Sequence, residues 1–354
     1  MLSRHVVVVQ LSGRKGNWWI THIKRKRYKN CSSSTTCGAF LLTMSLPSSI
    51  VDHSLRDRIR RIAAQVGNTP LREIKGISGK KGVSVFAKEE WRQLGGSVKA
   101  RAAYAIIRSA IDHGLLTEET VLLDATSGNT GIAYAAIARE IGIKVALCLP
   151  ENASKERKEI LTKLGVDIIY TSKFDGTDGA QQVARDLVAE HPRKYFYADQ
   201  YKNDNNWKAH YNTTAPEIFE ALPGITHFVA GLGTTGTFVG TGRRLRELAP
   251  SIKLIGLQPD SALHGLEGWK HLETAVVPKI YDETIADQIL EVTTEEAYDM
   301  IKFINEKEGL LLSPSSAANL AGAVKVAASV DEGVIVTVLP DNADKYSEVI
   351  KRII

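Results

Sequence analysis

The 354-residue chain has little cysteine and no long apolar run, and each absence excludes a class of protein. Its three cysteines, Cys31, Cys37 and Cys148, show neither a paired pattern nor the spacing of metal ligands. A disulfide scaffold and a metal site are therefore not expected, and a reducing compartment is the default. No run of about 18 apolar residues is present, so the sequence predicts no membrane-spanning segment.

Acidic side chains are absent from residues 1–43, which carry eight of the 45 lysines and arginines. The remaining chain has 37 basic and 40 acidic residues, a net charge of −3. A nucleic-acid-binding protein is expected to be basic over its folded body, so the overall charge of +5 does not predict one. We expect a mildly acidic, cytoplasmic globular protein behind a basic leader, with neither a nucleic-acid nor a membrane partner.

The leader, residues 1–43, combines a short apolar run (6–9), a basic cluster (24–27) and a Ser/Thr stretch (32–36). A secretory signal is disfavoured, because the apolar run has only about four residues and precedes the basic cluster. A transit peptide and a nucleic-acid-binding arm remain open. The favoured interpretation is a disordered or dispensable segment upstream of Met44.

From Met44 onward, runs of β-branched residues alternate with helical patterns. The sequence predicts strands at 83–87, 121–124, 144–149, 167–170, 226–230, 253–258 and 333–339, and helices at 54–66, 97–113, 131–141, 155–164, 179–190, 240–248, 294–307 and 317–328. Such alternation predicts parallel sheets with helices on both faces. We therefore predict the α/β class, with two doubly wound subdomains, 44–199 and 200–354, and a cleft between them.

Ligands of open α/β sheets bind at the carboxyl ends of strands, so the loops there are the most informative segments. The first is Thr126-Ser127-Gly128-Asn129-Thr130-Gly131, which follows a predicted strand and opens a predicted helix. Its backbone N–H groups and short hydroxyls at a helix N-terminus suit a carboxylate. Helix capping accounts for one or two such residues but not for six in a row, so we predict an anion-binding loop.

The second loop is Gly231-Leu232-Gly233-Thr234-Thr235-Gly236-Thr237. Its glycines allow close backbone approach and its threonines add donors, which favours a phosphate cradle over a simple tight turn. It lacks the lysine of a nucleotide-triphosphate loop, and no acid follows at the spacing of about 20 residues that dinucleotide binding needs. A small phosphorylated cofactor suits it better.

Lys99 stands at the start of a predicted helix, in Gly95-Gly96-Ser97-Val98-Lys99-Ala100-Arg101. The helix dipole disfavours a cation there, and this field together with partial burial would lower the pKa of the amine, as Schiff-base chemistry requires. Taken alone, Lys99 is more simply interpreted as a solvated lysine. The interpretation as a Schiff-base lysine is favoured only in combination with the two loops. A fourth segment, Ser313 to Asn319, is by itself a helix cap.

Four segments then occur in the order and spacing of a known family: Gly67-Asn68-Thr69-Pro70-Leu71, Gly96 to Lys99, Thr126 to Gly131 and Gly231 to Thr237. The chain in this respect resembles the fold type II (β-family) pyridoxal-phosphate enzymes, and specifically the cysteine synthases. The resemblance covers the chain from about Ile59 onward. It implies a fold like that of the tryptophan synthase β subunit, a homodimer and pyridoxal 5'-phosphate as cofactor.

The resemblance also implies a role for each matching residue. Lys99 would hold the cofactor and take the substrate Cα proton. The implied contacts are to the cofactor phosphate from Gly233, Thr234, Thr235, Gly236 and Thr237, to its ring from Asn129 and Ser315, and to the substrate carboxylate from Thr126, Ser127, Gly128, Thr130 and Gln200. A neutral serine beside the pyridine nitrogen favours loss of a β-substituent over transamination.

The implied reaction is a β-replacement that makes L-cysteine from O-acetyl-L-serine, or O-phospho-L-serine, and sulfide through an aminoacrylate. Lys270 aligns where relatives that use phosphoserine place a basic side chain, although a solvated lysine is the slightly favoured interpretation. Cystathionine β-synthase, serine/threonine dehydratase and a non-catalytic regulatory homologue are the alternatives. Ser97-Val98-Lys99 differs from the Ser-Phe-Lys of dehydratases, and the intact lysine and phosphate loop oppose a non-catalytic role.

Four positions depart from the family pattern. Ala100 stands where an Asp is usual, Gln93-Leu94 where Asn-Pro is usual, and Asp124-Ala125 where Glu-Pro is usual. Ser313-Pro314 replaces the glycine that normally precedes the pyridine serine. None of these changes removes a group that takes part in chemistry, so they indicate a divergent branch and leave the substrate open.

Overall fold

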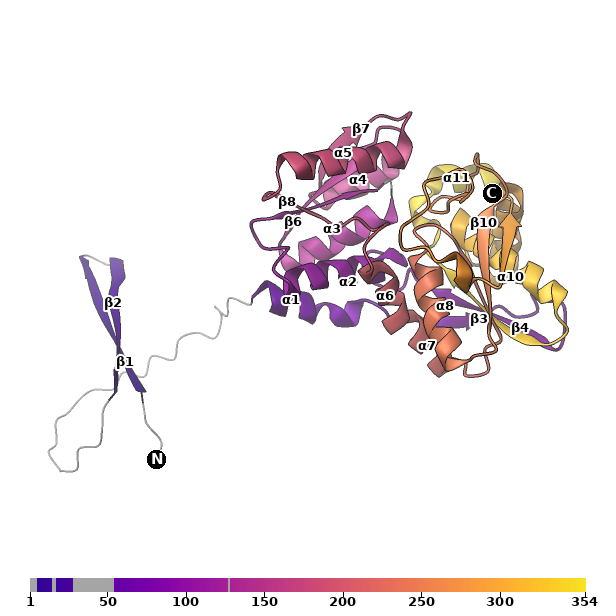
Figure 1. The fold of residues 1–354 in the computed structure, drawn as a ribbon, viewed down its shortest axis with the longest axis horizontal. Helices are drawn as coiled ribbons and strands as arrows, with labels where there is room; N and C mark the ends of the chain where they lie inside the picture. Colours follow the sequence, from indigo (N-terminus) through magenta and orange to yellow (C-terminus); the bar gives the residue numbers. More distant parts are fainter. Residues whose placement is uncertain (1–4, 15–16, 28–53, 127) are drawn as a thin grey trace, which may run out of the picture. The chain divides into compact units, whose positions relative to one another are not determined.

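The structure is a computed structural model that describes residues 5–14, 17–27, 54–126 and 128–354, in two compact units, Met1–Val51 and Asp52–Ile354 (Figure 1). In the first unit, β1 (His5–Arg14) pairs antiparallel with β2 (Asn17–Arg27). Over these strands the leader is a hairpin rather than the expected disordered chain, in keeping with the strand propensity of its valine run. Residues 28–43 lie outside the described residues, and the dispensability of the leader stays a prediction.

The second unit contains two sheets built mainly from parallel strands, as predicted. The six-stranded sheet runs in the order β11 (Gln288–Val292), β10 (Lys253–Pro259), β9 (His227–Gly231), β12 (Gly333–Leu339), β4 (Val83–Glu89) and β3 (Leu71–Glu73). The four-stranded sheet runs in the order β7 (Asp167–Thr171), β6 (Lys144–Pro150), β5 (Val121–Ala125) and β8 (Tyr195–Tyr197). Only β3 pairs antiparallel with its neighbour in these two sheets.

The boundary predicted at residue 199 does not separate the two sheets. β3 and β4 precede every strand of the four-stranded sheet, yet β4 pairs with β12 from Val83 opposite Gly333 to Glu89 opposite Leu339. The early part of 44–199 therefore completes the sheet of the C-terminal half. A pairing between strands about 250 residues apart leaves no local pattern, so the sequence rhythm could not show that this segment joins the later sheet.

The helices alternate with the strands over most of the second unit. They are α1 (Leu55–Arg61), α2 (Lys99–Asp112), α3 (Asn129–Ile141), α4 (Lys155–Lys163), α5 (Gly176–Glu190), α6 (Asn205–Asn212), α7 (Thr214–Ala221), α8 (Gly236–Leu248), α9 (Thr294–Glu308), α10 (Pro314–Ser329) and α11 (Ser347–Ile353). The predicted α/β class is confirmed. In the second unit, the strands and α-helices that the sequence missed are β3, β8, β11, α6, α7 and α11, all of eight residues or fewer. No helix in the part of the chain described here is long and apolar enough to cross a membrane.

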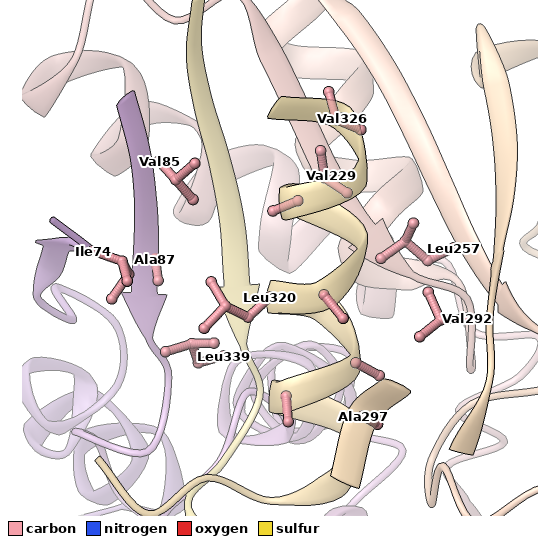
Figure 2. Close-up of a cluster of buried hydrophobic side chains, with 14 of the residues drawn as sticks. Ile74, Val85, Ala87, Val229, Leu257, Val292, Ala297, Leu320, Val326 and Leu339 are labelled. Carbon is pink, nitrogen blue, oxygen red and sulfur yellow. The ribbon is translucent and has the colours of Figure 1, made fainter. Parts of the chain in front are cut away.

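α10 is the central helix of the core beneath the six-stranded sheet. It begins at a serine cap, where Ser313 Oγ accepts the N–H of Ser316, followed by Pro314 in the first turn. Figure 2 shows its side chains, among them Leu320, next to Val85 of β4 and Leu257 of β10. This packing fixes the N-terminal turn of α10 relative to the ends of the neighbouring strands.

A buried ion-pair network lies directly behind Lys99. Arg101 of α2 donates from Nε to Glu90 Oε2 (2.6 Å) and from Nη1 to Glu217 Oε1 of α7 (2.7 Å). Lys88 Nζ lies 2.8 Å from Glu217 Oε2. Burial acts to raise the pKa of each carboxyl, but Arg101 outweighs it, so the pKa of Glu90 is lowered and that of Glu217 falls to about 2. The network fastens the start of α2 to β4 and α7.

Replacing Arg101 with Met should destabilise the fold by about 3–5 kcal/mol, because two buried carboxylates lose their main cation. The free energy of unfolding from urea titrations measures this effect. The matched control is Arg108→Met on the same helix, where the side chain is half exposed and its nitrogen lies 3.7 Å from Asp112. That change should stay within about 0.5 kcal/mol, and equal losses for the two variants would contradict a structural role for the network.

Candidate active site

A cavity of about 510 Å³ is lined by residues from the ends of strands in both sheets. Its wall includes Lys99 of α2, Asn129 of α3, Thr235 before α8 and Ser315 of α10. Four helices therefore begin at one cavity. Each helix N-terminus presents unpaired N–H groups and a partial positive charge, so the cavity is suited to an anionic ligand.

Most residues predicted for the site are brought together on this wall. They are Lys99, Thr126, Gly128, Asn129, Thr130, Gln200, Gly233, Thr234, Thr235, Thr237 and Ser315. Gly236 is not on the wall but is the first residue of α8, where a Cβ would lie 2.0 Å from Asn206 Oδ1. Ser127 lies outside the described residues.

Lys270 is a second predicted site residue that is absent from the cavity wall formed by the described residues. Its Nζ lies 3.6 Å from Asp178 Oδ1 and 5.2 Å from the centre of the Tyr201 ring. The lysine is thus engaged by a carboxylate and an aromatic face beside the cavity. Its predicted contact with a leaving group has no support from this geometry.

Among the described residues, Lys99 is the only lysine on the cavity wall. Within the described part of the chain, its Nζ makes no hydrogen bond and no ion pair within 4.0 Å. Burial lowers the pKa of Lys99 below its ordinary value, and the Asp341 carboxylate raises it by less. A lowered pKa increases the share of neutral amine, which is the form that attacks a carbonyl.

The glycine–threonine loop before α8 is shaped by close backbone approach. A Cβ on Gly233 would lie 1.9 Å from the carbonyl oxygen of Gly268, so only glycine fits there. Thr235 has a φ of +70°, a left-handed conformation that is strained for threonine. Its hydroxyl is buried and has no hydrogen-bond partner among the described residues. A phosphate bound at the start of the helix would accept a hydrogen bond from this hydroxyl and would account for the strained backbone conformation.

On the opposite wall, Gln200 is tied to the loop after β5. Thr130 Oγ1 donates to Gln200 Oε1 (2.7 Å), and Gln200 Nε2 donates to the carbonyl oxygen of Ala125 (3.4 Å). Asn129 Nδ2 donates to Asp341 Oδ2 (2.8 Å), while its Oδ1 is buried without a partner among the residues described. The amide oxygen of Asn129 is thus available to a hydroxyl of a ligand.

Asp124, one of the departures from the family pattern, lies beneath this loop. It is fully buried and accepts hydrogen bonds from Ala125 N–H (2.8 Å) and the Tyr134 hydroxyl (2.9 Å). Burial raises its pKa to about 7. The carboxyl therefore supports the loop from inside the core and does not reach the cavity wall.

Asn319 joins the wall that carries Ser315 to the glycine–threonine loop, and the sequence predicted it only as the last residue of a helix-cap segment, with no role of its own. Its Nδ2 donates to the carbonyl oxygen of Ser315 (3.1 Å), and its Oδ1 accepts the N–H of Gly231 (2.7 Å). The two predicted segments are therefore held together by one side chain. No local signal distinguishes this residue, because an asparagine one turn into a helix has no characteristic pattern.

Arg157 and Glu267 are two charged residues of the wall that sequence reasoning missed. They form an ion pair at the cavity wall, with the Arg157 guanidinium 5.0 Å from the centre of the Tyr346 ring. A Cβ on Gly128 would lie 3.6 Å from this guanidinium, which therefore packs against the loop after β5. A single arginine inside a predicted helix gave no reason to expect this position.

The C-terminal segment closes another part of the wall. Tyr346 and Glu348 line the cavity, and the Tyr346 hydroxyl donates to Asp341 Oδ2 (2.8 Å). Lys345 Nζ donates to the carbonyl oxygen of Gly96, just before Lys99 (2.7 Å). The C-terminal segment is thus anchored to the segment that presents Lys99.

Comparison with known proteins agrees with this geometry. The family model described as "Pyridoxal-phosphate dependent enzyme" matches residues 62–341. A cysteine synthase of Aquifex aeolicus (strain VF5) is 43% identical over 303 residues, which cover 83% of this chain and 93% of the relative. An O-acetylserine dependent cystathionine beta-synthase of Bacillus subtilis (strain 168) is 41% identical over 295 residues, covering 81% and 96%. The crystal structure of a cysteine synthase from Entamoeba histolytica matches with a TM-score of 0.76 and 28% identity, covering 86% and 92%.

The chain therefore belongs to the family of pyridoxal-phosphate-dependent enzymes. Within that family it has the type II fold and groups with the cysteine synthases, as the sequence motifs predicted.

The residues on the wall fit pyridoxal 5'-phosphate. Lys99 offers an amine without a protein partner among the described residues, and Thr235 offers a hydroxyl in the same condition. Asn129 Oδ1 is a free acceptor for the ring hydroxyl, and Ser315 stands on the same wall for the ring nitrogen. The donor set matches an aldehyde, a phosphate and a hydroxyl-bearing ring.

Gly233→Ala should weaken cofactor binding by at least about tenfold, because the added methyl group would displace the loop from Gly268. Titration of the apoprotein with pyridoxal phosphate, followed by the absorbance of the bound cofactor, measures the affinity. Gly224→Ala is the control, since a Cβ there meets open space and should leave the affinity unchanged. Equal affinity in both variants would show that the loop does not hold the phosphate.

Proposed function

We propose that the protein makes L-cysteine from O-acetyl-L-serine and sulfide by β-replacement. The observation that carries this proposal is the convergence of Lys99, the 233–237 loop and the 126–130 loop with Gln200 on one cavity wall. Relatives named cysteine synthase, 43% and 37% identical to this chain, support it. Ser315 adds the neutral partner that suits the loss of a β-substituent.

Pyridoxal phosphate supplies an aldehyde that joins to amino groups and a ring that takes up negative charge from the adjacent carbon. The N–H groups at the start of α3, with Thr126, Thr130 and Gln200, bind the α-carboxylate of the substrate. Lys99 Nζ, whose pKa is lowered by burial, accepts the Cα proton. Because Gln200 is bonded to Thr130, carboxylate binding also orders the loop over the reacting carbon.

The residues around the outer cavity keep water from the reacting carbon. Tyr346 is 4% exposed and packs against the Arg157 guanidinium, which in turn lies against the loop at Gly128. The C-terminal segment, Arg157 and the substrate loop therefore form one contiguous wall. A dry site protects reactive species from hydrolysis and strengthens the electrostatic contacts within it.

The charge of the wall favours an acetyl over a phosphoryl leaving group. Arg157 is the cation on the wall apart from Lys99, and Glu267 neutralises it. Glu348 adds a second carboxylate, and Lys270 is engaged by Asp178 beside the cavity. A dianionic phosphoryl group would thus meet a net negative outer wall, whereas a neutral acetyl ester would not.

We also propose the finer properties that the resemblance implies: a homodimer, a cytoplasmic location and a role in cysteine biosynthesis. The relatives named cysteine synthase support the biosynthetic role. The family match begins at residue 62, which is consistent with a leader that is dispensable for activity.

The purified protein should be yellow and should release cysteine from O-acetylserine and sulfide. Lys99→Ala should lose both the visible absorbance after dialysis and the cysteine formation, because the amine that bonds the cofactor is gone. Lys155→Ala is the matched control, since Lys155 is likewise the first residue of its helix but is exposed. Homocysteine offered in place of sulfide tests the cystathionine-forming alternative. A colourless wild-type protein, or turnover by Lys99→Ala, would overturn the proposal.

Glu267→Gln should raise kcat/KM for O-phospho-L-serine about fivefold relative to O-acetyl-L-serine, because it removes the carboxylate that forms the ion pair with Arg157. The ratio of the two kcat/KM values is the measurement. Glu348→Gln makes the same change of charge on the same wall without touching the Arg157 pair, and should alter the ratio less than twofold. Equal effects from the two variants would assign donor choice to the overall charge rather than to the ion pair.

A further inference from the structure

His210 of α6 lies immediately behind the phosphate loop and is 2% exposed. Its Nε2 lies 3.3 Å from Thr237 Oγ1, and its Nδ1 lies 2.9 Å from Thr214 Oγ1. Thr237 lines the cavity, whereas His210 does not. The imidazole therefore touches the site only through the Thr237 hydroxyl.

The imidazole is neutral. Burial lowers the pKa of His210 to about 3, and Arg101 lowers it further against the opposing charge of Glu90. Lys99 adds to the lowering and Glu217 opposes it. A neutral imidazole carries one proton, so one ring nitrogen donates a hydrogen bond and the other accepts one.

Thr214 decides which nitrogen holds that proton. Its side chain is fully buried, and its hydroxyl has one hydrogen-bond partner among the described residues, His210 Nδ1. A buried hydroxyl proton needs an acceptor, so Thr214 donates to Nδ1, which must then be unprotonated. The ring proton accordingly resides on Nε2 and is donated to Thr237 Oγ1.

The position of the ring is set by close backbone packing between α6 and α8. A Cβ on Gly240 would lie 2.0 Å from the carbonyl oxygen of Trp207 and 2.9 Å from the Cβ of His210. A Cβ on Gly236 would meet Asn206 Oδ1 at 2.0 Å. Two glycines in α8 thus let α6 approach so closely that the imidazole has little room to move relative to the phosphate loop.

We propose that His210 is a positioning residue that orients the Thr237 hydroxyl toward an anion in the cavity. Because Nε2–H occupies a lone pair of Thr237 Oγ1, the proton of that hydroxyl is not consumed by the ring and is left to point into the cavity. The inference rests on the proposed function in one respect: the anion is the phosphate of pyridoxal phosphate.

The test compares His210→Phe, His210→Gln and Thr237→Val, with the affinity of the apoprotein for pyridoxal phosphate as readout. Phe keeps an aromatic ring but lacks a donor, whereas the Gln amide N–H can replace Nε2–H. His210→Phe and Thr237→Val should each weaken binding about tenfold, the size of one lost hydrogen bond to a charged group. His210→Gln should stay within about twofold of the wild type.

The double variant His210→Phe/Thr237→Val distinguishes positioning from a purely structural role. If His210 acts through Thr237, the double variant should bind no more weakly than Thr237→Val alone. Additive losses, or a His210→Gln variant as weak as His210→Phe, would overturn the proposal.

Nitrogen NMR of the histidine ring provides a second measurement that needs neither a variant nor a cofactor. We expect a protonated Nε2 and an unprotonated Nδ1 in the apoprotein, and the opposite tautomer would overturn the inference. A wild-type apoprotein that bound no pyridoxal phosphate would instead refute the proposed function, while the NMR result would still decide the role of His210.

Discussion

The site depends on four helices that begin at the same cavity. The N-termini of α2, α3, α8 and α10 each leave backbone N–H groups without helical partners and each carry partial positive charge. Concentrating these ends in one place is electrostatically unfavourable until an anion fills the cavity. A cofactor with a phosphate and a substrate with a carboxylate supply that charge at two separate points. The fold and the chemistry are therefore linked through one constraint, which also explains why the loops before these helices are rich in glycine, serine and threonine.

The helix N-termini at the cavity must be held in place, and buried polar side chains hold them through ion pairs and hydrogen bonds. Arg101, which lies two positions after Lys99 in α2, forms ion pairs with Glu90 and Glu217. Asn319 couples the loop at Gly231 to the helix that carries Ser315. The Nζ of Lys99 is left without a hydrogen-bonding partner among the described residues, and burial lowers its pKa, as the proposed role of this amine requires. The first turn of α2 thus contains both Arg101, whose ion pairs stabilise the fold, and Lys99, whose amine has no partner among the described residues and is proposed to take part in the chemistry.

The charge arrangement on the outer wall bears on substrate choice. The alignment of Lys270 with basic residues of relatives that use phosphoserine predicted a contact with the leaving group, and in the structure its Nζ lies 3.6 Å from Asp178 Oδ1 beside the cavity. Arg157 occupies the wall instead, and Glu267 accompanies it there. The position of a charged residue in the sequence is therefore less informative about substrate specificity than the residue with which it pairs in the folded protein. This is also why Asp124, which replaces a usual Glu, acts as buried support rather than as a site residue.

The sequence by itself determined the class of the fold and the chemistry of its loops, since both depend on local patterns. Alternating strands and helices, the two Gly/Thr-rich loops and the lysine at a helix start are visible within about ten residues each. Tertiary structure decided what depends on distance in space. It placed β3 and β4 in the sheet of the other half, brought Arg157 to Glu267 and Tyr346, and set His210 behind Thr237. Those contacts join segments separated by about 27 to 250 residues, and no periodicity in a chain records which distant segments will pack together.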